Sequence, residues 1–200
     1  KVMRSYQYFA SSAISDKVAQ NDWMTGTQRG GYIWHTTGSG KTMTSFKSAE
    51  LISQSDDADK VIFLVDRIEL ASQSYREYSG FAGEGLDVQQ TDDTADLLEK
   101  LLSDDAKDQL IITSIQKMSR VKAGETNVTK SLLAGLEEKT IVFIVDEAHR
   151  STFGDMLLDI KHSFPRALFF GFTGTPIQLE NQKKMNTTAT VFGDELHRYS

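Results

Sequence analysis

Short runs of apolar residues alternate along this chain with longer segments in which apolar residues recur every three or four positions. The short runs are typical of strands buried on both faces, and the recurring pattern is typical of amphipathic helices. We predict strands at residues 32–35, 61–65, 110–113, 141–145 and 167–172, with a short one near Val88. We predict helices at residues 4–20, 41–54, 67–79, 92–104 and 115–121. This alternation predicts an α/β fold in which a mostly parallel central sheet carries helices on both faces.

A glycine-containing loop follows the first predicted strand and leads into the helix at residues 41–54. It reads His-Thr-Thr-Gly-Ser-Gly-Lys-Thr from His35 to Thr42. Glycines let backbone N–H groups turn inward around phosphate, and the helix N-terminus adds positive potential. Lys41 is predicted to reach the β- and γ-phosphates of a bound nucleotide, and Thr42 to place its hydroxyl on Mg²⁺. The predicted cofactor-binding loop comprises Thr37, Gly38, Ser39, Gly40, Lys41 and Thr42.

One position of this loop departs from the common phosphate-binding pattern, which has glycine where this chain has His35. The core of the pattern, Gly38-x-Gly40-Lys41-Thr42, is intact. The alternative interpretation is a Gly-Ser-Gly turn that caps the helix without binding a nucleotide. The order strand, loop, helix favours the phosphate loop.

An acidic box, Asp-Glu-Ala-His, follows the strand predicted at residues 141–145. Asp146 at the tip of this strand is predicted to hold the hydration shell of Mg²⁺. Glu147 is predicted to orient and deprotonate the attacking water, and His149 to relay or sense this state. The alternative is that Asp146 caps a following helix and Glu147 is solvated. A phosphate loop in the same chain favours the catalytic interpretation.

Composition and charge narrow the class of protein. The chain has 200 residues and no cysteine, which excludes a disulfide scaffold, a cysteine zinc site and a thiol nucleophile. A cytoplasmic location fits this composition. No apolar run approaches the roughly 20 residues that span a bilayer, so we expect no membrane partner.

The net charge of −6 counts against a protein that coats nucleic acid. Many of the acids, however, lie at residues 56–59 and 92–108, away from the polar clusters that follow the strands.

The phosphate loop and the acidic box resemble the first two signature motifs of superfamily 2 helicases and translocases. Four further segments resemble other motifs of that superfamily, in the expected order. They are an adenine-reading glutamine motif (Arg4-x-Tyr6-Gln7), two DNA-side motifs (Asp66-Arg67 and residues 113–117) and a coupling motif (Thr-Gly-Thr-Pro from Thr173). The resemblance implies a RecA-like domain that binds ATP and Mg²⁺.

The same resemblance assigns roles that single residues would not support. It implies that Gln7 reads adenine, although one glutamine is equally well a surface residue. It implies that Arg67, Gln116 and Lys117 contact nucleic acid, although the two cations are equally well solvated. It implies that Thr173, Gly174 and Thr175 couple hydrolysis to domain movement, although the threonines could cap a strand-end turn. Trp34 lies in an apolar strand and is assigned to the core, and His197 receives no role.

Three details are similar to motor subunits of type I restriction–modification enzymes: the loop that starts at His35, the box that ends at Arg150, and the tail from residue 191 to Tyr199. This implies an ATP-driven translocase of double-stranded DNA, with methyltransferase and specificity subunits as partners and a nuclease outside the chain. We expect an excised piece of a longer protein. Residues 1–180 would form the first RecA-like domain, and residues 181–200 would begin the connection to a second.

A second RecA-like domain supplies an arginine finger, so the isolated first domain should hydrolyse ATP poorly. Three alternatives stay open at this point. The chain could be another superfamily 2 DNA or RNA helicase or remodeller, a P-loop phosphotransferase, or a nucleotide-binding switch without turnover.

Overall fold

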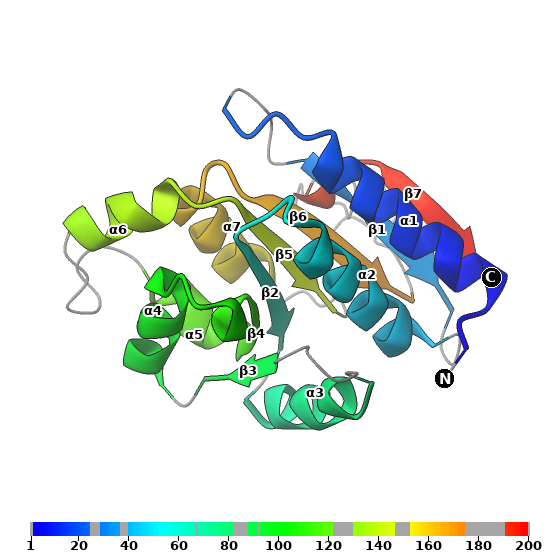
Figure 1. Ribbon diagram of the computed structural model, residues 1–200, viewed down its shortest axis with the longest axis horizontal. Coiled ribbons are helices and arrows are strands. Elements are labelled where there is room, and N and C mark those ends of the chain that lie inside the picture. The colour runs from blue at the N-terminus through cyan, green and yellow to red at the C-terminus, as the bar shows by residue number, and fades with distance from the viewer. Residues whose placement is uncertain are drawn as a thin grey trace.

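The computed structural model describes residues 2–24, 29–36, 40–66, 68–81, 88–91, 93–121, 130–146, 153–174 and 191–199. Within them, seven strands form one sheet in the order β3-β4-β2-β5-β6-β1-β7, and each neighbouring pair is parallel (Figure 1). The strands are β1 (Arg29–His35), β2 (Lys60–Val65), β3 (Val88–Gln90), β4 (Leu110–Ser114), β5 (Ile141–Val145), β6 (Leu168–Thr173) and β7 (Glu195–Tyr199). The predicted α/β fold with a parallel sheet is confirmed.

Helices lie on both faces of this sheet (Figure 1). They are α1 (Ser5–Ala19), α2 (Lys41–Ser55), α3 (Ile68–Phe81), α4 (Thr94–Leu102), α5 (Ile115–Ser119), α6 (Lys130–Glu137) and α7 (Phe153–Ser163), with a short 3-10 turn at Ala106–Asp108. None of the helices in the described ranges is both long enough and apolar enough to cross a membrane.

Two hydrophobic clusters fill the space between the sheet and its helices. In β5, Val142 and Ile144 pack into the cluster that α1, α2 and α3 cover, whereas Phe143 and Val145 pack into the cluster that α4 to α7 cover. Side chains of a strand alternate between the two faces of its sheet, so an unbroken apolar run fills both clusters. This explains why the central strands could be recognised from their sequences.

The edge strand β7 was not predicted. It pairs with β1 in parallel, with His197 opposite Ile33 and Tyr199 opposite His35. Its charged and histidine side chains give no apolar run, because an edge strand is covered on fewer sides than a central one. Gly31 makes room for it: its φ is 138°, and a Cβ there would lie 2.5 Å from Cγ of Leu196. Residues 195–199 thus belong to this sheet, and a second domain beyond them stays a prediction.

Candidate nucleotide-binding site

The predicted catalytic residues that the structure describes meet at one edge of the sheet. Lys41 and Thr42 begin α2 directly after β1, Asp146 follows β5, and Thr173 ends β6. Strand β6 lies between β1 and β5, so the carboxyl ends of all three strands are adjacent. This is the edge at which open parallel sheets bind their ligands. Several predicted site residues lie outside the described residues: Thr37, Gly38, Ser39, Arg67, Glu147, His149 and Thr175.

Gly40 shapes the turn from the phosphate loop into α2. Its φ of 78° lies in the left-handed region, which side chains with a Cβ rarely adopt. Its carbonyl accepts hydrogen bonds from the backbone N–H of Thr44 at 3.0 Å and from Thr44 Oγ1 at 3.1 Å. The first turn of α2 contains no acidic residue. Its N–H groups and dipole therefore present positive potential to an anion at the loop.

Gln7 supports this turn from α1. The side chain is buried at 4% exposure, so the interpretation of Gln7 as a surface residue is wrong. Its Nε2 donates to the carbonyl of Gly40 at 3.2 Å, and its Oε1 accepts from the backbone N–H of Arg4 at 2.9 Å. An amide carries two donor hydrogens and two acceptor positions, so capacity is left for a ligand. The reading of adenine by Gln7 stays a prediction.

The body of α2 is held by buried hydroxyl groups. Ser45 Oγ donates to the carbonyl of Thr42 at 2.8 Å and lies 2.7 Å from the hydroxyl of Tyr78 on α3. Burial raises the pKa of Tyr78 well above its usual value, and the negative charge of Asp146 adds to this effect. Asp146 therefore lies within electrostatic range of Tyr78, the α3 residue that contacts Ser45 on α2.

His35 lies in a cluster of rings that the sequence did not reveal. The side chain is fully buried, and its Nε2 lies 3.1 Å from Nδ1 of His197 on β7. Tyr6 meets the His35 ring edge-on and stacks on Tyr199 at 3.8 Å between centroids. Burial, then His197 and the charge of Lys41, lower the pKa of His35 to about 4. A neutral imidazole therefore stands at the start of the phosphate loop.

The coupling motif begins inside the sheet. Thr173 is fully buried at the end of β6 and is the register partner of Trp34 on β1. The assignment of Trp34 to the core needs correction, because its side chain is only half-buried. The indole instead donates from Nε1 to the carbonyl of Gly174 at 3.0 Å, and the guanidinium of Arg198 lies over its ring. A tryptophan carries a polar N–H that needs an acceptor, which a strand-end loop supplies.

The predicted nucleic-acid residues Gln116 and Lys117 lie in α5, which starts directly after β4. Ser114 caps this helix by accepting from the backbone N–H of Lys117 at 3.3 Å. The ammonium of Lys117 donates to the carbonyl of Thr91 at 2.5 Å, so it ties α5 to the end of β3. Because β4 is parallel to β1, both residues lie at the same edge of the sheet as Lys41, toward its other side. Contact with DNA stays a prediction for them.

The donor set fits a magnesium-bound nucleoside triphosphate. Mg²⁺ prefers oxygen ligands and keeps several waters, and Thr42 and Asp146 offer a hydroxyl and a carboxylate. Among the described residues, no group of three or more histidine, cysteine or acidic side chains could hold a metal by itself. A Mg²⁺ ion that enters with a nucleotide takes phosphate oxygens and waters as its other ligands.

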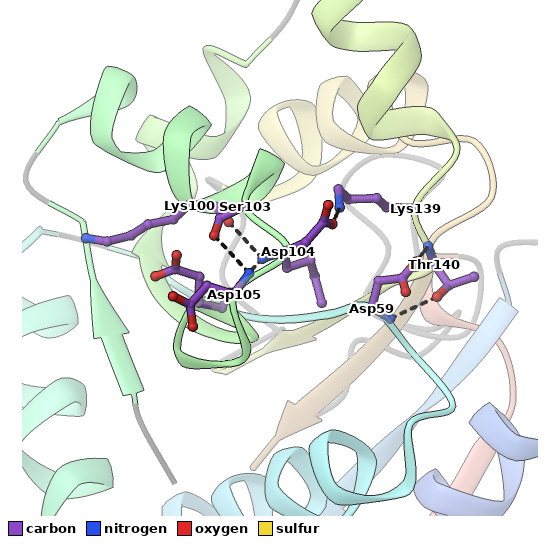
Figure 2. Close-up of polar contacts among 9 residues, drawn as sticks. Asp59, Lys100, Ser103, Asp104, Asp105, Lys139 and Thr140 are labelled. Carbon is purple, nitrogen blue, oxygen red and sulfur yellow. Dashed lines mark hydrogen bonds and ion pairs between the residues drawn. The ribbon is translucent and has the colours of Figure 1, made fainter.

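A cavity of about 260 Å³ lies elsewhere, at the amino ends of the strands near the start of β2. Figure 2 shows its ion pair between Lys139 and Asp104, 2.6 Å long, and the reciprocal hydrogen bonds of Asp59 and Thr140. The buried ammonium of Lys60 donates to two backbone carbonyls there. These hydrogen bonds and the ion pair join the start of β2 to the segments that precede β4 and β5, so the cavity lies at a polar junction between elements.

Taken together, the phosphate loop, the acid after β5 and the coupling motif after β6 define a P-loop ATPase domain of the helicase and translocase class. A family model for the SWI2/SNF2 ATPase matches residues 6–200. The chain therefore belongs to the SWI2/SNF2 ATPase family, and the predicted resemblance to superfamily 2 ATPases is confirmed.

Sequence relatives narrow the context. The chain is 45% identical over 198 residues to the type I restriction enzyme SauMSSORF170P endonuclease subunit of Staphylococcus aureus (strain MSSA476), covering 98% of this chain and 20% of that protein. It is 40% identical over 167 residues to the C-terminal part of the putative type I restriction enzyme MpnIIP of Mycoplasma pneumoniae, again an endonuclease subunit, covering 82% of this chain and 79% of that protein. The chain thus spans about a fifth of the staphylococcal protein. The predicted resemblance to type I restriction enzymes is confirmed.

Solved structures share the fold at low identity. A nuclease-deletion mutant of the Type ISP restriction-modification enzyme LlaGI, in complex with a DNA substrate mimic, matches with a TM-score of 0.67 and 20% identity over 100% of this chain and 20% of that one. The Sulfolobus solfataricus SWI2/SNF2 ATPase core in complex with dsDNA matches with a TM-score of 0.60 and 14% identity over 88% of this chain and 32% of that one.

Proposed function

We propose that this chain is the first RecA-like motor domain of a type I restriction endonuclease, and that it hydrolyses Mg–ATP to move double-stranded DNA. The observation that carries the proposal is the position of these residues around β6, whose last residue is Thr173. Lys41 and Thr42 follow β1, and Asp146 follows β5, which are the two neighbours of β6 in the sheet. The nucleotide and the coupling motif would then both lie at the carboxyl ends of these three neighbouring strands. Hydrolysis could change the position of the coupling motif directly.

Each residue has a role in this proposal. Lys41 neutralises the β- and γ-phosphates, and Gln7 contacts the base. Thr42 and Asp146 hold Mg²⁺, which when bound stabilises negative charge that develops on the phosphates. Glu147 takes a proton from the attacking water, and His149 relays this state. The residues that would complete the loop and the coupling motif are Thr37, Gly38, Ser39, Gly40, Gly174 and Thr175.

DNA is the proposed track, and Arg67, Gln116 and Lys117 are its proposed contacts on this domain. The support is the position of α5 at the ligand edge, together with relatives of the same fold that were solved with DNA. Methyltransferase and specificity subunits are the proposed partners, by the naming of the sequence relatives as type I endonuclease subunits. The proposed location is the cytoplasm.

The test uses the full-length protein in its complex. ATP hydrolysis is measured with and without double-stranded DNA, and the proposal expects DNA to stimulate it. Lys41→Ala should abolish nucleotide binding, whereas Glu147→Gln should keep binding and lower kcat by about 100-fold or more. Lys107→Ala and Glu138→Gln are matched controls on exposed residues of the described chain.

Two results would overturn the proposal. Hydrolysis that is indifferent to DNA would exclude a DNA motor, and phosphate transfer to a small molecule would identify a phosphotransferase instead. Full turnover by the Glu147→Gln variant would remove the proposed base from the mechanism.

A further inference from the structure

Trp34 lies next to both the phosphate loop and the coupling motif, the two motifs that a motor must connect. It is the register partner of Thr173 on β6 and of Arg198 on β7. Two residues later, the backbone N–H of Thr36 donates to the carbonyl of Tyr199 at 3.1 Å. The main chain that enters the phosphate loop is therefore held by sheet hydrogen bonds on both sides of Trp34.

The side chain of Trp34 reaches the coupling motif. Its Nε1 donates to the carbonyl of Gly174 at 3.0 Å, immediately after the end of β6. Glycine has no side chain, so its backbone carbonyl is one of the few groups through which a neighbour can orient this residue. The indole is half-buried, which shields the hydrogen bond from competing water. One residue thus contacts the coupling motif by its side chain and precedes the phosphate loop in its backbone.

The orientation of the indole is fixed from β7. The guanidinium of Arg198 lies 4.1 Å from the ring centroid, within the range of a cation–π contact. Glu195 holds that guanidinium by two hydrogen bonds of 3.0 Å each, and also accepts from the hydroxyl of Tyr32 at 3.3 Å. A planar fork against a carboxylate fixes direction as well as distance. The Arg198–Glu195 pair therefore holds the ring in the orientation that aims Nε1 at Gly174.

We propose that Trp34 is a positioning residue that links the phosphate loop to the coupling motif at Gly174, with Arg198 as the clamp that orients it. This rests on the proposed function, since coupling has meaning only in a motor. The phosphate loop and the coupling motif should then move together when the nucleotide changes. Loss of the indole N–H should leave ATP bound but weaken the connection between its hydrolysis and movement along DNA.

The experiment compares Trp34→Phe with the wild type in the full-length complex. Phenylalanine keeps a ring under Arg198 and removes the hydrogen-bond donor. We expect DNA-stimulated kcat to fall by about three- to tenfold, as loss of one hydrogen bond allows, with KM for ATP within about twofold. We also expect more ATP consumed for each strand displaced from a triplex during translocation. Trp23→Phe, the same change at the partly buried tryptophan packed against the core, is the control.

Arg198→Met provides a second route, because this exposed residue can change without disturbing the core. Arg198→Met should raise the ATP consumed for each displaced strand by a smaller factor than Trp34→Phe does. It provides the test if Trp34→Phe does not fold. Wild-type kcat and coupling in both variants would overturn the inference alone. A higher KM for ATP together with a lower kcat and a lower thermal stability would also overturn the inference, because these changes would show a merely structural role. Absence of DNA stimulation in the wild type would instead overturn the proposed function and the inference with it.

Discussion

The amide of Gln7 donates to the carbonyl of Gly40 across 33 positions of sequence. This one hydrogen bond joins the first turn of α1 to the residue that caps α2, and therefore to the edge of the proposed nucleotide site. The N-terminal helix thus supports the phosphate loop from outside the strand–loop–helix unit that contains it.

Replacement of Gln7 tests this support. Gln7→Glu keeps the size of the side chain but removes the N–H donor and places an oxygen against the Gly40 carbonyl. We expect weaker binding of a fluorescent ATP analogue and a free energy of unfolding lower by about 1–3 kcal/mol, because a buried polar group loses its partner. Gln73→Glu on the exposed face of α3 is the control. Unchanged affinity in Gln7→Glu would show that the contact is not needed for the loop.

Gly40→Ala should be among the most damaging small changes in this chain. Alanine would meet Gln7 Nε2 at 2.5 Å and would have to adopt a φ of 78°. We expect a loss of about 1–3 kcal/mol in the free energy of unfolding and a marked loss of ATP binding. Urea unfolding and nucleotide titration measure the two effects.

The control for this variant is Gly80→Ala in α3, where a Cβ would have nothing within 4 Å. Helix propensity predicts a neutral or stabilising change there, of up to about 1 kcal/mol. If Gly40→Ala behaves like Gly80→Ala, the left-handed turn is not a requirement of the fold.

Stability should fall on acidification because of His35. Its pKa is lowered from 6.5 to about 4 by burial first, then by His197 and Lys41. The unfolded chain therefore takes up a proton that the folded chain refuses, so stability is full above pH 6.5 and is lost as the pH falls toward 4. Urea unfolding at pH 7 and at pH 5 should show a smaller pH-dependent loss for His35→Gln than for the wild type. His162→Gln, at an exposed position of α7, should keep the wild-type loss.

The hydroxyl pair of Ser45 and Tyr78 should contribute to stability as a unit. Their oxygens lie 2.7 Å apart and both side chains are buried. Tyr78→Phe should lower the free energy of unfolding by about 1–2 kcal/mol, because Ser45 loses a partner. The double variant with Ser45→Ala should cost less than the sum of the two single changes. Additive losses in chemical denaturation would show that the two groups do not interact.

Local sequence was enough to predict the central part of this fold. Residues 141–145 are apolar throughout, and a strand covered on both faces needs that composition wherever it lies. The phosphate loop and the acidic box follow their strands directly, and parallel strands bring their carboxyl ends to one edge. The position of Lys41 and Asp146 at the same edge of the sheet could therefore be expected from the sequence.

Other features depend on contacts between segments far apart in the chain. The edge strand β7 has no apolar run, and it exists because β1 offers it an open row of backbone groups. The hydrogen bond from Trp34 to Gly174 and the contact of His35 with His197 join positions 140 and 162 residues apart. Spacing along the chain carries no trace of such pairs. The residue types and their order thus establish the sheet and the edge at which the predicted site residues lie. The contact of Arg198 with Trp34 and the lowered pKa of His35 arise only when β1, β6 and β7 lie side by side.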